Sequence, residues 1–297
     1  MRKWRLIACV FCAVGLLMAC GSSEDNIQLV EQEDIVKGSE PEAEEIKVPE
    51  EEELPQKDEE EAEGGEEVIS EKTPAVVNIE TVEQEYKEGE LLLMTTVYDK
   101  VSVVIEGNEE AENLIAEWFT KNEEAFQESA EETLEWEKEN QDMIESTSSY
   151  YQSHGFAVTR NDGRILSFSS NTGGYEGGAH GYYMEYGLNF DVATGQFLSI
   201  ADVVTDEAAF QEICVQEMLR QCDGLKAEGI LFDDQIIVPS LKEVLEGKME
   251  GEEWYFMEKG IRFISNIYEI APYAAGKITF DIPYEMVNEA LKEEYKG

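Results

Sequence analysis

Apolar and polar residues alternate in several short segments of this chain, which is the pattern of half-buried β-strands. The longest such segment runs from Leu91 to Ile105, where six positions on one face carry Leu, Val or Ile. A shorter apolar run at 76–82 precedes it, and Lys87-Glu88-Gly89-Glu90 between the two favours a turn. We therefore predict that the two segments pair as a β-hairpin.

A long segment with helical periodicity follows this hairpin. Asn108 is a favourable N-cap, and glutamates at 109, 110 and 112 suit the first turn of a helix. Apolar residues then recur at helical spacing from Ile115 to Leu134, and the pattern continues weakly toward Tyr150. The spacing predicts one long helix whose apolar stripe packs against a sheet.

Further strand patterns lie beside turn sequences. Asn161-Asp162-Gly163 is a strong hairpin signal, and Gly260 suits the left-handed position of a three-residue loop. Alternating residues also precede a turn at 191–195. The strands expected beside these turns are 156–160, 164–170, 182–190, 254–257 and 261–264.

Helical patterns recur in the second half of the chain. We expect Thr205 to cap a helix, a shorter helix over Pro239–Leu245, a strand over 278–282 and a terminal helix from Tyr284. Hairpins with helices between them favour an α+β fold. We therefore expect mostly antiparallel sheets built from hairpins, packed by one long helix and several shorter helices.

The first twenty residues have the layout of an export signal. Basic residues at 2, 3 and 5 precede an apolar run, and Leu17-Met18-Ala19-Cys20 resembles the bacterial lipobox, in which the cysteine becomes the lipidated first residue. We expect residues 1–19 to be a lipoprotein signal peptide and Cys20 to carry acyl chains such as palmitate. This predicts a protein anchored to the cell membrane on its extracytoplasmic side.

The balance of acidic and basic residues divides the remaining chain into two segments. Residues 21–74 carry 21 acidic and four basic residues and almost no aromatic ones, so we expect 20–74 to be a disordered acidic tether. The rest, in which we distinguish the regions 75–175 and 176–297, carries 46 acidic and 15 basic residues. Such a charge disfavours nucleic acid and anionic lipid, and favours cationic partners, although acidic surfaces also serve solubility alone.

Few residues offer catalytic or metal chemistry. Cys214 and Cys222 lie eight residues apart in a helical pattern, too distant for a disulfide, so we expect two reduced thiols in the core. The sequence has two histidines, His154 and His180, and neither lies in a zinc, nucleophile-elbow or dinucleotide motif. We expect no metal and no cofactor.

Glycines and tyrosines gather near His180. The glycines of 173–181 indicate unusual backbone angles between two strands, and His180 is then a loop-fixing residue or a ligand contact. Strand alternation places Tyr182 and Tyr186 toward the core and Tyr183 and Glu185 on the opposite face, which is our candidate contact surface.

Two stretches together resemble a known family. One contains Gly177-Gly178-Ala179-His180-Gly181, Gly187-Leu188-Asn189-Phe190-Asp191 and Leu198-Ser199-Ile200-Ala201-Asp202-Val203-Val204. The other contains Trp254-Tyr255-Phe256 and Tyr268-Glu269-Ile270-Ala271-Pro272-Tyr273. They resemble the extracytoplasmic domain of lysozyme-responsive anti-sigma-V factors (RsiV-like) and of PdaC-type peptidoglycan deacetylases, PdaC-like over 75–175 and RsiV-like over 176–297.

The resemblance implies a binding or sensing module. Since a lipobox stands in place of a sigma-binding segment and no catalytic domain follows, we expect neither an anti-sigma role nor deacetylase activity. The leading hypothesis is a non-enzymatic lipoprotein that binds lysozyme or another cationic protein. The alternatives are a peptidoglycan or other cell-wall glycan-binding module and an enzyme with His180 as its base. The candidate binding residues are His180, Tyr183, Glu185, Tyr268 and Tyr273.

Overall fold

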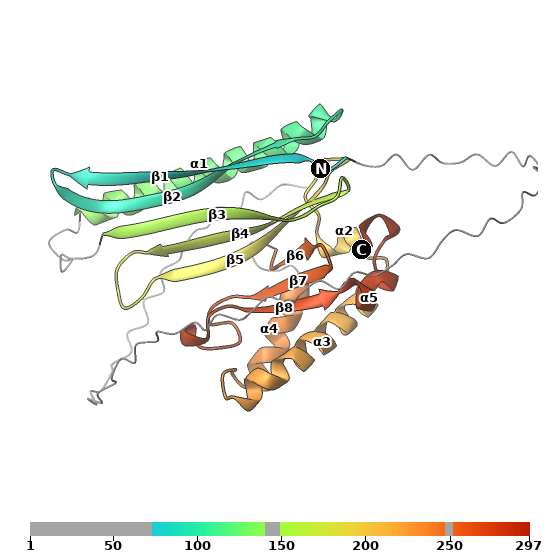
Figure 1. Cartoon of the computed structure of the whole chain (residues 1–297). Helices are drawn as coiled ribbons and strands as arrows, with labels where there is room; N and C mark the ends of the chain where they lie inside the picture. The colour runs from blue at the N-terminus through green and yellow to red at the C-terminus, as the bar shows by residue number, and fades with distance from the viewer. Residues whose placement is uncertain (1–72, 140–148, 247–251) are drawn as a thin grey trace, which may run out of the picture. The chain divides into compact units, whose positions relative to one another are not determined.

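The computed structural model describes residues 73–139, 149–246 and 252–297, which all lie in one compact unit. The expected signal peptide, Cys20 and nearly all of the tether lie outside the described residues. The α+β prediction is confirmed, with one five-stranded and one three-stranded sheet (Figure 1). Among the described residues, no helix is both long enough and apolar enough to cross a membrane.

The five-stranded sheet has the order β1-β2-β3-β4-β5. Its strands are β1 (Val76–Glu88), β2 (Leu91–Val104), β3 (Tyr150–Asn161), β4 (Ile165–Tyr175) and β5 (Tyr182–Asp191). The predicted hairpins β1–β2 and β3–β4 are confirmed, and β4–β5 form a third. Because β4 and β5 pair across 175/176, the first sheet extends beyond the expected region 75–175.

One pair in this sheet, β2–β3, is parallel. The long helix α1 (Glu109–Glu139) connects these two strands and returns the chain to the end of the sheet where β2 began. The predicted cap is confirmed, since Asn108 accepts a hydrogen bond from the backbone of Ala111. The helix is described as far as Glu139, and the expected continuation toward Tyr150 crosses 140–148, outside the described residues.

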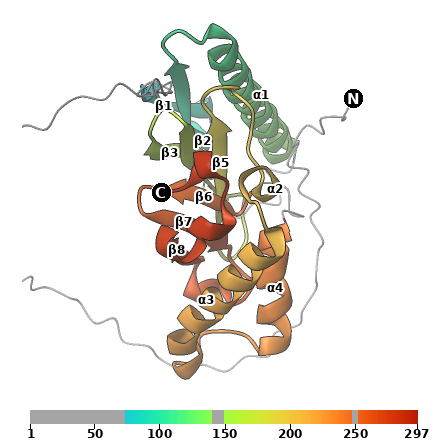
Figure 2. The ribbon, with the colours of Figure 1, turned by 90° about the vertical axis from the view of Figure 1, so that its right-hand side faces the viewer.

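The first core lies between α1 and the sheet. Ile115 and Phe119 of α1 are buried against Phe156, Phe168 and Phe190 of three strands, and the aromatic rings meet mostly edge to face. Figure 2 shows α1 along one side of the sheet. This is the arrangement that the single apolar stripe predicts.

The three-stranded sheet has the order β6 (Trp254–Met257), β7 (Gly260–Ser265) and β8 (Ile278–Pro283), all antiparallel. The helices α3 (Glu207–Ala227) and α4 (Asp234–Glu246) pack against it (Figure 2). Short helices α2 (Ile200–Val203) and α5 (Tyr284–Val287) complete the described helices, with 3-10 turns at 273–275, 288–290 and 293–295. Cys214 and Cys222 are buried free thiols in this second core, as predicted.

Two helix starts differ from the prediction. The cap of α3 is Asp206 and not Thr205, because the Asp206 carboxylate accepts from the backbone of Ala209. The shorter helix begins at Asp234, so Pro239 lies inside it and not in its first turn. Pro239 lies on the exposed side of α4, while Ile237 and Leu241 on the other side are buried in the second core.

The two sheets meet at the edge of β5. Gly187 donates a backbone hydrogen bond to Glu252, and the side chain of Asn189 bonds both Trp254 and Phe256 of β6. A second asparagine, Asn266, bonds the backbone N–H and carbonyl of Glu185 through its side chain. Side-chain amides thus continue the hydrogen bonding of β5 into the second sheet.

Candidate functional site

Two loops and the start of β5 carry a surface cluster of aromatic side chains. The first loop, 176–181, joins β4 to β5, and the second, 266–277, joins β7 to β8. Positive φ angles at Gly177 (92°) and Gly178 (88°) turn the first loop, which confirms the reading of this glycine-rich stretch. We call His180, Tyr183, Tyr268 and Tyr273 the aromatic cluster.

The rings of the aromatic cluster contact one another directly. His180 stacks on Tyr273 with ring centroids 3.9 Å apart, and Tyr268 lies 5.7 Å from Tyr273. Tyr183 meets Tyr273 edge to face at 6.1 Å. Four of the five candidate residues taken from the sequence are therefore brought together.

His180 has a defined role in this cluster. Its Nδ1 lies 2.9 Å from the carbonyl oxygen of Gly181, which can only accept, so Nδ1 carries a proton. In the neutral ring Nε2 then accepts from the hydroxyl of Tyr268 at 3.1 Å. The nitrogen that a general base would use is already occupied by Tyr268, so the geometry assigns His180 to fixing the two tyrosines.

Tyr268 has an unusual backbone conformation. Its φ is 70°, and among the described residues it is the one non-glycine residue with a positive φ. It occupies the third position of a turn in which Glu269 N–H donates to the carbonyl of Asn266, a position that usually takes Gly or Asn. Its side chain is 54% exposed. A strained, exposed aromatic residue is typical of a binding site.

Glu185, the fifth candidate, lies elsewhere than expected. We placed it on an exposed face with Tyr183, which is 37% exposed, but Glu185 is only 5% exposed. The docked second sheet covers it: the hydroxyl of Tyr255 donates to its carboxylate at 2.8 Å, and Lys277 donates to its other oxygen. Burial and the Glu185 carboxylate raise the pKa of Tyr255 to about 12. Glu185 therefore supports the site from inside.

Several supporting residues were missed at the sequence level. Gly276 has a φ of 75°, and a Cβ there would lie 2.8 Å from the hydroxyl of Tyr183, so the loop needs glycine. The buried Asn266 bonds the half-buried Glu269 through its backbone N–H and lies within 3.5 Å of the buried Glu253 through its side chain. The spacing Asn266-x-x-Glu269, in which a glutamate returns to an earlier backbone N–H, resembles half of a capping box and is the one local signal of these contacts.

The other histidine belongs to the first core. His154 is buried, its Nε2 lies 2.7 Å from the hydroxyl of Ser170, and burial lowers its pKa to about 4 against the opposing effect of Asp99. Among the described residues, no group of three or more His, Cys, Asp or Glu side chains could hold a metal ion.

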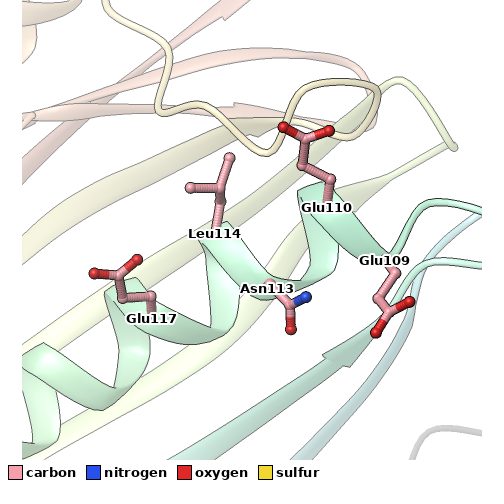
Figure 3. Close-up of a pocket in the computed structure, with 5 residues that line it drawn as sticks. All are labelled: Glu109, Glu110, Asn113, Leu114 and Glu117. Atoms are coloured by element: carbon pink, nitrogen blue, oxygen red, sulfur yellow. The ribbon is translucent and has the colours of Figure 1, made fainter.

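A shallow hollow of about 430 Å³ lies along the start of α1 (Figure 3). Its lining comes from one helix, namely Glu109, Glu110, Asn113, Leu114 and Glu117. This end of α1 contacts the chain after β5, since Asn108 donates to Val192 and Ala193, whereas the aromatic cluster lies at the start of β5. With three carboxylates and no second wall, this hollow does not rival the aromatic cluster as a site.

Comparisons with known proteins agree with this architecture. The family described as "Deacetylase PdaC" matches residues 98–183, and the family described as "Protein of unknown function (DUF3298)" matches residues 207–285. No curated protein matches the chain.

Two solved structures are similar to the described fold. A DUF3298 family member from Bacteroides fragilis matches with a TM-score of 0.56 at 18% identity, over 74% of this chain and 94% of that chain. A DUF3298 family protein from Pseudomonas aeruginosa matches with a TM-score of 0.46 at 16% identity, over 76% of this chain and 99% of that chain.

The fold and its cluster define an α+β domain of two docked sheets, with aromatic side chains on two adjoining loops and the start of β5. The two family matches lie in consecutive parts of this chain, and they support a PdaC/RsiV-like domain within residues 98–285. The resemblance drawn from the sequence motifs is thereby confirmed.

Proposed function

We propose that this protein is a lipid-anchored, extracytoplasmic binding module without catalytic activity, and that its aromatic cluster recognises a cationic protein of the cell envelope such as lysozyme. The observation that carries the proposal is the aromatic cluster itself, above all the exposed and strained Tyr268. Anchoring through Cys20 rests on the lipobox-like sequence alone.

The ring chemistry suits a basic partner. Tyrosine faces attract guanidinium and ammonium groups, and such contacts contribute roughly 0.5–2 kcal/mol each. Tyrosines are also frequent among the residues that dominate protein interfaces, because they bury a large area with few rotatable bonds. Residues 75–297, with 46 acidic and 15 basic residues, would also attract a basic protein to the domain as a whole.

The binding experiment uses the full-length protein in detergent and immobilised lysozyme. We expect retention at about 20 mM salt and loss at about 500 mM, because salt screens charge steering. Tyr268→Ala and Tyr273→Ala should each weaken binding by about tenfold or more. Tyr151→Ala is the matched control, because Tyr151 is similarly exposed (39%) on β3 and has no ring contact with the cluster among the described residues.

Two outcomes would contradict parts of this proposal. Absence of retention at low salt would exclude lysozyme as the ligand. Pelleting with purified cell wall that depends on Tyr268 and Tyr273 would favour the glycan-binding alternative, for which exposed aromatic faces are equally suited.

The anchor is tested separately. Cys20→Ser removes the acyl acceptor and should move the protein from the membrane fraction to the soluble fraction of the cell envelope. If the wild-type protein carries no lipid at Cys20, or keeps residues 1–19, the proposed location is wrong.

A further inference from the structure

The aromatic cluster is built from both sheets of the protein. Tyr183 lies on β5 of the first sheet, whereas Tyr268 and Tyr273 lie in the loop between β7 and β8 of the second sheet. The strand pair at the base of this loop is Ser265 with Ile278. The backbone hydrogen bonds of the second sheet therefore close the loop, but they do not place it against β5.

Both ends of the loop 266–277 are attached to one residue of β5, Glu185. At the first end, the side-chain oxygen of Asn266 accepts from the backbone N–H of Glu185 at 2.8 Å, and its amide nitrogen donates to the Glu185 carbonyl at 3.1 Å. At the second end, the ammonium group of Lys277 donates to the carboxylate oxygen Oε2 of Glu185. Glu185 lies two residues after Tyr183, on the same face of β5, so both attachments lie next to the aromatic cluster.

The ion pair between Glu185 and Lys277 lies at the junction of several strands. The Glu185 side chain is buried, and the Lys277 side chain is 32% exposed. The other carboxylate oxygen of Glu185 accepts from the hydroxyl of Tyr255 on β6 at 2.8 Å, and Lys277 also donates to the side-chain oxygen of Asn171 on β4 at 3.3 Å. Because a buried carboxylate without a cation is costly, Glu185 favours the loop position in which Lys277 reaches it.

We infer that Lys277 is a positioning residue of the aromatic cluster, which acts through its ion pair with Glu185. The pair holds the loop so that the ring of Tyr273 meets the rings of His180 and Tyr183. The inference rests on the proposed function only in that the aromatic cluster is the proposed recognition surface.

The backbone between Tyr273 and Lys277 is short and hydrogen-bonded. Residues 273–275 form a 3-10 turn, and the Gly276 N–H donates to the Tyr273 carbonyl at 3.0 Å. Gly276 has a positive φ of 75°, and it lies so close to Tyr183 that a Cβ would be 2.8 Å from the tyrosine hydroxyl. Since Lys277 follows directly, a shift of its backbone should move the Tyr273 ring.

The two histidines of the chain allow a test without any ligand. Full-length protein in detergent, labelled with isotopic histidine, should give one Hε1 signal for each ring in NMR spectra at a single pH, and His180→Gln assigns them. The Tyr273 ring, 3.9 Å away, should displace the His180 signal upfield, and Tyr273→Ala gives the unstacked reference. His154 lies in the first core, so its signal reports whether the protein is folded.

Removing either charge of the pair should release the Tyr273 ring. Lys277→Met keeps a long side chain without the charge and should lose most of the His180 displacement. Lys296→Met is the matched control and should keep the displacement, because Lys296 is similarly exposed (35%) but pairs with Glu293, outside the two loops.

A double-mutant cycle tests whether the two residues act through the same contact. Glu185→Gln should also lose most of the displacement. The double variant Lys277→Met/Glu185→Gln should then lose no more than either single variant, because one ion pair cannot be removed twice.

Each contrary outcome has a defined meaning. Wild-type displacement in Lys277→Met would overturn the inference, and so would losses that add in the double variant. If the His154 signal shows that Lys277→Met does not fold, the double variant replaces it, because it also removes the buried charge. A double variant that keeps the displacement would overturn the inference, as would one that unfolds, since the pair would then serve the whole fold.

Failure of the proposed function is distinguishable from failure of this inference. The spectra contain no ligand, so absence of lysozyme binding leaves their result unaffected. If Lys277→Met lost the His180 displacement and still bound lysozyme as wild type, the inference would stand and the proposed recognition by Tyr273 would be wrong.

Discussion

At the scale of single residues, the backbone conformation of Tyr268 lowers the stability of the protein but places the tyrosine ring in the aromatic cluster. A left-handed conformation costs an L-residue about 1–2 kcal/mol, which glycine avoids. The turn keeps a tyrosine there, with its hydroxyl on His180 and its ring near Tyr273. Strain of this kind persists where the surroundings enforce it, as the buried Ile267 and Ile270 on either side do.

Tyr268→Gly separates the two roles. Removal of the strain should offset the lost ring contacts, so the free energy of unfolding should stay within about 1 kcal/mol of wild type or exceed it. Binding of the cationic partner should weaken. Urea denaturation together with the lysozyme assay measures both, and a loss of stability above about 2 kcal/mol would show that Tyr268 is a structural residue.

Because His154 is buried in the first core, it should lower the stability of the folded protein at acid pH. Its pKa is lowered to about 4 by burial, so between about pH 4 and 6.5 the unfolded chain binds a proton that the folded chain does not. Stability is therefore lost as pH falls through this window. His154→Gln can still bond Ser170 but does not titrate, so wild type should lose about 2 kcal/mol more than this variant between pH 7 and 4.5 in denaturant titrations. Parallel losses in the two proteins would contradict this.

At the scale of elements, local signals predicted most of the fold. The turn Asn161-Asp162-Gly163 fixed the β3–β4 hairpin, and the apolar stripe of α1 predicted its contact with the sheet. The parallel pairing of β2 and β3 and the docking of the second sheet on β5 depend on residues far apart in sequence. The tyrosines of the cluster were identified from the sequence, but the burial of Glu185 was not. Strand alternation predicts which face of the sheet a side chain lies on, but it does not predict which distant part of the chain covers that face.

The docking of the two sheets depends on a glycine at its closest approach. A Cβ at Gly187 would lie 1.7 Å from the backbone oxygen of Trp254, which cannot move without shifting β6. Gly187→Ala should therefore destabilise the protein by about 3 kcal/mol or more. Gly224→Ala is the matched control: it lies in α3 with no atom within 4 Å of the added Cβ, and should stabilise by about 0.5–1 kcal/mol. A tolerated Gly187→Ala would contradict the docking geometry.

At the scale of the whole molecule, excess negative charge acts against folding and in favour of a basic partner. The ion pairs among the described residues are mostly exposed, as in Lys121 with Glu117 and Lys296 with Glu293, and contribute little each. Carboxylates without a partner therefore repel one another across residues 75–297, where they outnumber basic groups three to one.

Salt should consequently act in opposite directions on stability and on binding. Raising sodium chloride from about 20 to 500 mM screens the self-repulsion, so Tm of the full-length protein should rise by several degrees. The same change should weaken lysozyme binding, because the attraction between the acidic domain and the basic partner is screened to the same extent. Thermal unfolding and binding measured on one salt series make the comparison. If binding fell only where Tm also fell, the salt effect on binding would reflect loss of the fold, and the electrostatic part of the proposed recognition would be wrong.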